Sequence, residues 1–345
     1  MKFLSVIQKG IQRQYVALSL AGKILAIAFL LTAIGAVPLF IEIPNLFVSS
    51  LLELFLIILF LFWLVYWLGL LKNFPRIEGV VRVYTSYAVY FYMTDVWVRV
   101  ILYTSPFRFI DPNLKAFAHD VGFSLPAVMN FVYQWPWLVR FTWLVYGSLG
   151  YEVMLLPLVL ALLGNRKAYE VYLGALIMGS LIGGLLYFLF PTTDPSAVYH
   201  DAHFILPQIQ KVSIVHDIHK HIYLKFNSLA VVGFPSFHVM WATLISLAFL
   251  QYRKSFIPIA IWNILIILST MGTGWHYLGD VLGGLVLGVL MFVSMTWLQN
   301  REGVSYPTPL WIKREGREKL SILNLLLVVC LLLGIGLFLV GYLFG

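Results

Sequence analysis

Residues 255–298 read SFIPIAIWNILIILSTMGTGWHYLGDVLGGLVLGVLMFVSMTWL, and this stretch decides the class of fold. It holds two apolar runs, 255–272 and 276–298, separated by three residues, and its one acidic side chain is Asp280. A helix needs about 20 mainly apolar residues to cross the roughly 30 Å hydrocarbon core of a bilayer. The two runs therefore predict a pair of transmembrane helices joined by a short turn.

The rest of the chain repeats this pattern. Of its 345 residues, 61% are hydrophobic and 11% are charged, which excludes a soluble globular, disordered, collagen-like or nucleic-acid-binding protein. We predict an all-α, polytopic integral membrane protein with about nine transmembrane helices. The predicted spans are 24–43, 46–71, 83–105, 141–163, 169–191, 236–252, 255–272, 276–298 and 321–344.

The distribution of Lys and Arg predicts the orientation, because cytoplasmic loops are enriched in these residues. With the N-terminus in the cytoplasm, sixteen of them fall in inside segments and five in outside segments. We expect a cytoplasmic N-terminus and functional loops on the exoplasmic face. The short loops favour the plasma (inner) membrane of a prokaryote, and in a eukaryote the Golgi would be the equivalent location.

Three regions are expected along the chain. Residues 1–82 hold two N-terminal transmembrane helices and a cytoplasmic linker, and residues 299–345 hold a basic cytoplasmic loop and a C-terminal transmembrane helix. Between them, residues 83–298 form a six-helix core with two long outside loops, 106–140 and 192–235. Long loops often carry function, so both are candidates for the site.

Two histidines stand where outside loops enter predicted spans. In GFPSFH, residues 233–238, Ser236 is a natural N-cap, so His238 should lie in the first helical turn beside unpaired N–H groups that suit an anion. His276 and Asp280 are four residues apart, so on a helix the carboxylate can orient the imidazole and raise its basicity. Either feature alone could be structural, but together they point to a reaction centre.

Three strings in order carry a family resemblance: YFLFPTTDP at 187–195, FPSFH at 234–238 and STMGTGWHYLGD at 269–280. The last two resemble the second and third signature motifs of the type 2 phosphatidic acid phosphatase superfamily. More narrowly, they resemble the branch of inositol phosphorylceramide and sphingomyelin synthases, and the first string is similar to the first motif of the inositol phosphotransferases. The resemblance covers the six-helix core.

The resemblance implies transfer of a phospho-head group through a phosphohistidine, without a metal or cofactor. His276 would attack phosphorus, Asp280 would orient it, and His238 would protonate the leaving oxygen. The partners would be a phospholipid donor, with phosphoinositol as the expected head group, and a lipid acceptor such as ceramide or diacylglycerol in the outer leaflet. The expected substrate-binding residues are Ser236, Tyr187, Pro191, Tyr277, Arg140, Arg99 and Lys225.

The chain departs from the phosphatase motifs at three positions. Where those members carry Lys and Arg in the first motif and Arg in the third, this chain has Gly183, Phe190 and Thr270. A site that lacks three cations suits a phosphodiester, with one negative charge, better than a phosphomonoester with nearly two. We therefore favour a transferase over a phosphatase.

Several charged residues keep more than one interpretation. The cations that could replace the missing charges are Arg99, Arg140, Lys211 and Lys225. Arg99 lies four residues from Asp95 in a predicted span, where a charged pair is either functional or mutually neutralising, and Glu152 is equally open. An outside-loop cluster could bind zinc, contact a head group or simply be solvated: His200, Asp201, His203, His216, Asp217, His219 and His221.

Two other functions remain open. The first is a lipid phosphate phosphatase that acts on phosphatidate or a polyprenyl diphosphate, for which a cationic first motif is expected. The second is a lipid transporter in which His and Asp relay protons, for which helices broken near mid-membrane are expected. The histidines instead lie at the ends of predicted spans, which favours the enzyme.

Overall fold

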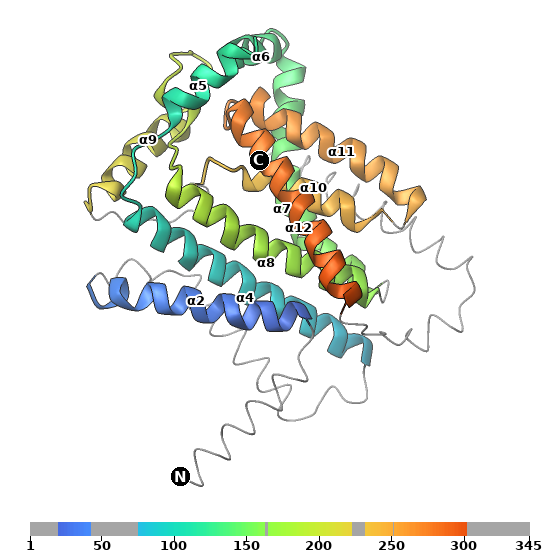
Figure 1. The fold of residues 1–345 in the computed structure, drawn as a ribbon. Helices are drawn as coiled ribbons and strands as arrows, with labels where there is room; N and C mark the ends of the chain where they lie inside the picture. The colour runs from blue at the N-terminus through green and yellow to red at the C-terminus, as the bar shows by residue number, and fades with distance from the viewer. Residues whose placement is uncertain (1–19, 43–74, 163–164, 223–231, 251, 302–345) are drawn as a thin grey trace.

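The computed structural model describes residues 20–42, 75–162, 165–222, 232–250 and 252–301 (Figure 1). All regular structure in these residues is helical, as predicted. The elements are α2 (Leu20–Glu42), α4 (Pro75–Thr104), α5 (Asp111–Asp120), α6 (Leu125–Tyr133), α7 (Pro136–Leu162), α8 (Arg166–Leu189), η2 (Pro195–Ala197), α9 (Leu206–His219), α10 (Phe237–Ala248), α11 (Arg253–Gly272) and α12 (Leu278–Arg301).

The long helices form a bundle, and the short ones gather at one end of it. Helix α10 packs against α7, α8, α11 and α12, and α8 packs against α4 and α12. Helices α5, α6 and α9 lie together at one end of the bundle (Figure 1). They come from the two predicted outside loops, which therefore fold into helices that pack against the bundle: α5 on α12, α6 on α7 and α11, and α9 on α4.

Helices occupy seven of the nine predicted spans, and the runs at 46–71 and 321–344 lie outside the described residues. Among the described helices, three are long and apolar enough to cross a membrane: Lys167–Leu189, Ser255–Gly272 and Leu278–Arg301. The number of nine spans stays a prediction, as do the limits of the six-helix core.

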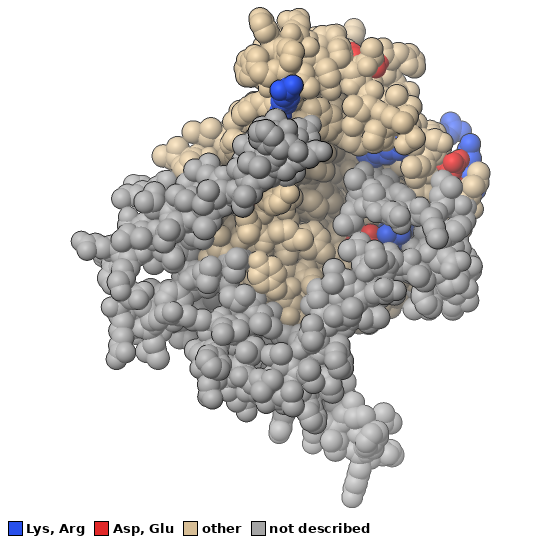
Figure 2. Space-filling view, turned by 180° about the vertical axis from the view of Figure 1, so that it is seen from behind, with Lys and Arg blue, Asp and Glu red and all other residues tan. Residues whose placement is uncertain are grey.

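The outer faces of α11 and α12 are apolar. On α11, Ile257, Ile261, Ile264 and Leu268 are each more than half exposed and recur at helical spacing. On α12, exposed side chains such as Val286 lie opposite buried ones. The described part of the surface in Figure 2 also carries few charged side chains. Helices that are apolar on the inner and outer faces are typical of membrane spans.

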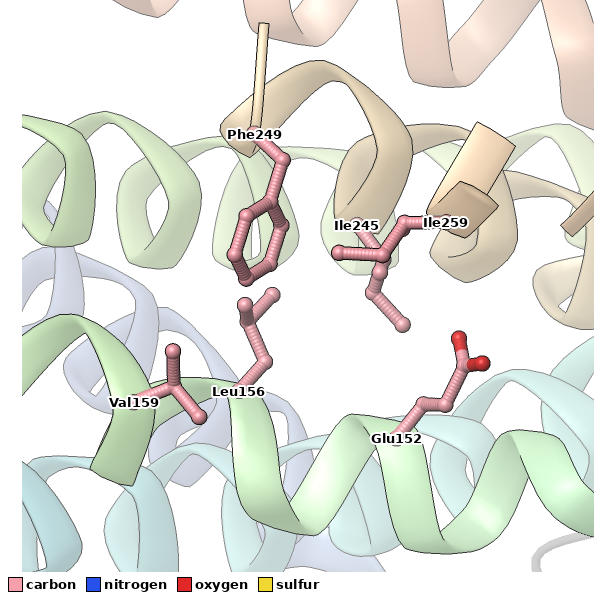
Figure 3. A pocket seen from close by; sticks show the side chains of 6 residues that line it. All are labelled: Glu152, Leu156, Val159, Ile245, Phe249 and Ile259. Carbon is pink, nitrogen blue, oxygen red and sulfur yellow. The ribbon is translucent and has the colours of Figure 1, made fainter. Parts of the chain in front are cut away.

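A small cavity lies between α7, α10 and α11 (Figure 3). Its volume is about 20 Å³, enough for one water molecule. Glu152 points into it among five apolar side chains, and its Oε2 has no hydrogen-bond partner in the described part of the chain. Glu152 thus lies in the bundle interior, and not among the predicted site residues.

Glycines let α10 and α12 approach closely. A Cβ at Gly284 of α12 would collide with the carbonyl oxygen of Ser236, and one at Gly288 would lie 3.0 Å from Thr243 Cβ and 3.2 Å from the Met240 carbonyl oxygen. Glycines four residues apart form one strip of a helix surface on which a partner backbone can rest. This contact holds the start of α10 against the start of α12.

Candidate active site

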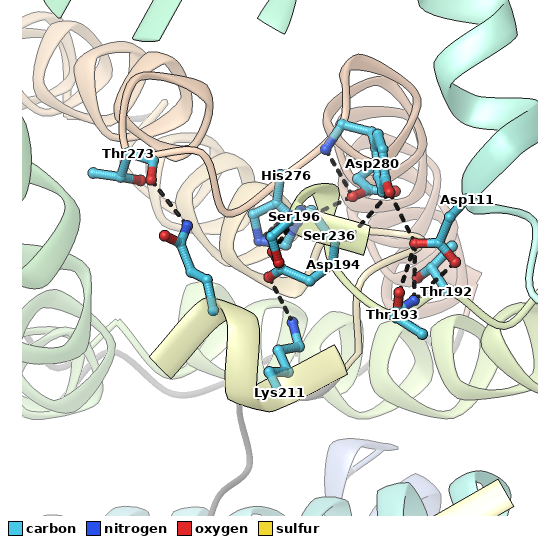
Figure 4. Close-up of polar contacts among 12 residues, drawn as sticks. Asp111, Thr192, Thr193, Asp194, Ser196, Lys211, Ser236, Thr273, His276 and Asp280 are labelled. Atoms are coloured by element: carbon cyan, nitrogen blue, oxygen red, sulfur yellow. Dashed lines mark hydrogen bonds and ion pairs between the residues drawn. The ribbon is translucent and has the colours of Figure 1, made fainter. Parts of the chain in front are cut away.

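The site forms where the segment before α10 meets the turn between α11 and α12 (Figure 4). Gly274 adopts a φ of +78°, which ends α11 and reverses the chain. Ser236 caps α10 by accepting a hydrogen bond from Val239 N at 3.3 Å, as predicted. Its own backbone N–H donates to the Asp280 carbonyl oxygen at 3.1 Å, which ties the two helix starts together.

His276 is held from both ring nitrogens. Its Nδ1 lies 3.3 Å from Asp280 Oδ2 and its Nε2 lies 3.1 Å from Ser236 Oγ, while only 3% of the residue is exposed. The Tyr277 backbone N–H donates to the same Asp280 oxygen at 3.0 Å. A carboxylate on Nδ1 selects the tautomer with its proton there, which leaves the Nε2 lone pair to react. His276 itself lies in the turn before α12, and not on the helix as expected.

The environment of His276 keeps it neutral. Burial lowers the pKa of its imidazole to about 3, and the positive charge of Lys211 acts in the same direction. An imidazole that is neutral at pH 7 has its lone pair available. The protonation state therefore agrees with a nucleophile.

His238 lies beside His276 in the first turn of α10, as predicted. The two ring centroids are 5.6 Å apart, and the His238 ring stacks on Tyr146 of α7 at 4.8 Å. Tyr146 also stacks on Trp275 at 6.4 Å. The aromatic stack fixes the plane of the His238 ring beside the ring of His276.

A buried polar network supports the turn that carries His276. The Tyr277 hydroxyl donates to Asp111 Oδ1 at 2.9 Å and lies 3.0 Å from the Asp194 carbonyl oxygen. The Thr193 backbone N–H and hydroxyl each donate to Asp111 Oδ1 at 3.0 Å. Burial raises the pKa of both Asp111 and Tyr277. The Tyr277 hydroxyl, predicted to bind substrate, is therefore engaged in holding α5 to the 192–194 segment.

Lys211 of α9 brings a positive charge to the site. Its Nζ lies 3.7 Å from Asp194 Oδ2 (Figure 4) and 5.4 Å from the centroid of the Trp275 ring. Gln208 anchors the same helix by donating to the Thr273 carbonyl oxygen at 3.0 Å. Burial raises the pKa of Asp194 to about 6, although Lys211 opposes the shift.

The other predicted substrate-binding residues have mixed positions. Tyr187 is buried, and its hydroxyl donates to the Thr192 carbonyl oxygen at 2.9 Å. The Pro191 carbonyl oxygen accepts a hydrogen bond from Ile110 N at 2.9 Å. Both residues therefore shape the segment beside the site. Arg140 is exposed near the start of α7. Arg99 binds Asp95 at 2.9 Å within α4, which supports the neutralising interpretation of this pair. Lys225 lies outside the described residues.

The histidines of the loop cluster contact aromatic rings. His203 binds Asp201 at 2.7 Å and packs on Tyr133, while His216 and His219 pack on Phe109. In the described part of the chain, no group of three or more His, Cys, Asp or Glu side chains could hold a metal ion.

Sequence reasoning missed four contributors to the site: Asp111, Tyr146, Asp194 and Trp275. Asp111 and Tyr146 lie more than 90 residues before their partners, Tyr277 and His238, so no spacing pattern could connect them. Trp275 and Asp194 stand inside the quoted strings GWHYLGD and PTTDP, and their position beside the signature residues was an available signal.

Comparison with known proteins yields one match. No curated protein and no solved structure matches the chain. The family model of the PAP2 superfamily matches residues 112–294, just over half of the chain, and this range contains His238, His276 and Asp280. The chain therefore belongs to the PAP2 superfamily.

Proposed function

We propose that this protein is a membrane lipid phosphotransferase that moves a phospho-head group from a phospholipid to a lipid hydroxyl through a phosphohistidine. Membership of the PAP2 superfamily supports a lipid phosphatase or phosphotransferase. The observation that carries the proposal is the buried His276, with Nδ1 on Asp280 and Nε2 directed at Ser236. Phosphoinositol is the proposed head group and ceramide or diacylglycerol the proposed acceptor, as in the branch that the three motifs resemble.

In the first step, the Nε2 lone pair of His276 attacks phosphorus and the bond from phosphorus to the diacylglycerol oxygen breaks. His238, in its protonated form, donates its proton to that oxygen, and diacylglycerol leaves as a neutral alcohol. The buried and cationic surroundings that keep His276 neutral act on His238 as well, so its protonated form depends on the negative charge of the bound phosphodiester beside it. Asp280 stabilises the imidazolium that forms on His276, because Nδ1 keeps its proton against Oδ2.

In the second step, the acceptor hydroxyl attacks the phosphohistidine. His238 takes the hydroxyl proton, the new phosphorus–oxygen bond forms and the phosphorus–nitrogen bond breaks. His276 returns to its neutral form and His238 is again protonated. The cycle is balanced in atoms and charge and needs no metal or cofactor.

Three observations favour a transferase over a phosphatase. Gly183 packs against Phe237, Phe190 is exposed, and Thr270 binds its own helix through the Ile267 carbonyl oxygen, so none of the three motif positions brings a charge. Beside the site, Lys211 lies close to the carboxylate of Asp194. The surroundings are better matched to one negative charge than to two.

The test uses full-length protein in lipid nanodiscs with phosphate-labelled phosphatidylinositol, with and without ceramide or diacylglycerol. We expect label in a new lipid only with acceptor, loss of transfer in His276→Ala, and acid-labile label on the wild-type protein. Gly150→Ala is the control, since a Cβ there meets nothing within 4 Å. Release of the label mainly as inorganic phosphate would show a phosphatase, and no turnover of any donor would favour the transporter.

We also infer the orientation from the charge asymmetry of the loops. The short helices α5, α6 and α9 would face the exoplasmic side of a prokaryotic plasma membrane, with the N-terminus in the cytoplasm. Labelling of Lys220→Cys in intact cells by a membrane-impermeant maleimide tests this, because Lys220 directly follows α9 and is exposed. Labelling only after the cells are permeabilised would reverse the orientation.

A further inference from the structure

The cation beside the reaction centre comes from α9, an element outside the signature motifs. The residue carrying it, Lys211, is only 8% exposed, and its charge contributes to the lowered pKa of His276. Two other cations are engaged elsewhere. Lys115 is exposed and donates to the Val198 carbonyl oxygen at 2.8 Å, and Arg99 binds Asp95.

Several buried polar atoms of the segments that meet at Lys211 have no hydrogen-bond partner among the described residues, although one of them, Asp194 Oδ2, forms the ion pair with Lys211. In the described part of the chain, four such atoms belong to the segments that meet here: Asp194 Oδ2, Ser196 Oγ, Trp275 Nε1 and Asp280 Oδ1. The Trp275 indole N–H and the Ser196 hydroxyl, which lies beside Asp194, can each donate a hydrogen bond, whereas the two carboxylate oxygens can only accept one. Native proteins leave few buried groups unpaired, so a cluster of them is a place where a bound molecule can supply the missing partners. Donors next to a cation suit an anion.

The geometry allows Lys211 to change partners. Its distance to Asp194 Oδ2, 3.7 Å, is longer than a charge-assisted hydrogen bond, and its ammonium also lies over the Trp275 ring, next in sequence to His276. Figure 4 shows Lys211 directed from α9 toward Asp194, with Ser196, Ser236 and His276 beside them. A small rotation of a lysine side chain can therefore exchange one oxygen ligand for another.

We propose that Lys211 binds the phosphate of the substrate, and that it leaves Asp194 for a phosphate oxygen when the substrate enters. Lys211 then supplies the charge that Gly183, Phe190 and Thr270 do not. This inference rests on the proposed function and names the residue that binds the phosphate. Because Asp194 stays nearby, the site accepts one negative charge better than two, so a phosphodiester is preferred to a phosphomonoester.

The test separates phosphate binding from neutralisation of Asp194. The variants are Lys211→Met, Lys211→Arg, Asp194→Asn and the double variant Lys211→Met/Asp194→Asn, with Lys115→Met as the matched control. Binding of dimethyl phosphate and of inorganic phosphate is followed by ³¹P NMR on nanodisc-embedded full-length protein. Head-group transfer is measured in parallel.

We expect Lys211→Met to weaken dimethyl phosphate binding at least about tenfold and to lower kcat/KM about 100-fold, with partial recovery in Lys211→Arg. Asp194→Asn should bind dimethyl phosphate as tightly as the wild type or more tightly. The double variant should stay defective even though Asp194→Asn removes the carboxylate that Lys211→Met alone leaves without a counter-charge. Lys115→Met should behave as the wild type.

Recovery of wild-type binding and transfer in the double variant would overturn the proposal, because Lys211 would then only neutralise Asp194. Tighter binding of inorganic phosphate than of dimethyl phosphate would overturn the preference for one charge. If the wild type transfers no head group but binds dimethyl phosphate through Lys211, the proposed function fails while this inference stands.

Discussion

Gly284→Ala tests whether the close contact of α10 and α12 sets the geometry of the site. The added methyl group would collide with the Ser236 carbonyl oxygen and approach Val239 Cβ to 3.0 Å. Because the obstacle is backbone, ordinary contact requires the start of α10 to move by about 1 Å. A displacement of that size at reacting groups costs about 100-fold in rate. Overpacking costs about 1–3 kcal/mol, which the better helix propensity of Ala offsets by up to about 1 kcal/mol.

Gly284→Ala should therefore lower kcat of head-group transfer by about 100-fold while the Tm in detergent falls by only a few degrees. Gly288→Ala, which meets Thr243 and Met240 one turn further from the site, should lose less activity. Gly150→Ala, with open space around it, should keep full activity and stability. Wild-type kcat in Gly284→Ala, or equal losses in all three variants, would refute the reasoning.

Three further predictions concern single side chains. Asp280→Asn should lower kcat about 1,000-fold with little change in KM, because the amide no longer stabilises the imidazolium of His276. A change in KM with kcat unaltered would contradict this role of Asp280. Tyr277→Phe should lower the free energy of unfolding by about 1–3 kcal/mol, because Asp111 loses a hydrogen-bond donor. The same variant should keep kcat/KM within a few-fold of the wild-type value. Thermal unfolding measures the first effect and steady-state kinetics the second. Because the pKa of Asp194 is raised from 3.8 to about 6, its charged form costs stability above pH 6, and this cost disappears as the pH falls toward 4. Wild type should thus gain up to about 3 kcal/mol relative to Asp194→Asn between pH 7 and pH 4, and parallel Tm–pH curves would exclude the shift.

Much of the fold and part of the site could be predicted from local sequence. Apolar runs of span length mark helices, since crossing a bilayer or packing in a bundle demands them regardless of their partners. Ser236 as an N-cap, with His238 in the next turn, follows from backbone groups within four residues. The contact between His276 and Asp280 likewise needs only the geometry of a turn entering a helix.

Contacts between segments distant in the sequence could be known only from the tertiary structure. Spacing could not predict that Tyr146 of α7 stacks on His238 or that Asp111 accepts a hydrogen bond from Tyr277. Nor could it predict that Lys211 reaches Asp194. Lys211 was one of four candidate cations in the sequence, and the packing of α9 over the turn that carries His276 distinguishes it. Local patterns express hydrogen bonding and burial within one helix. The meeting of α5, α7 and α9 at one site depends instead on how the helices pack together, which no short stretch of sequence encodes.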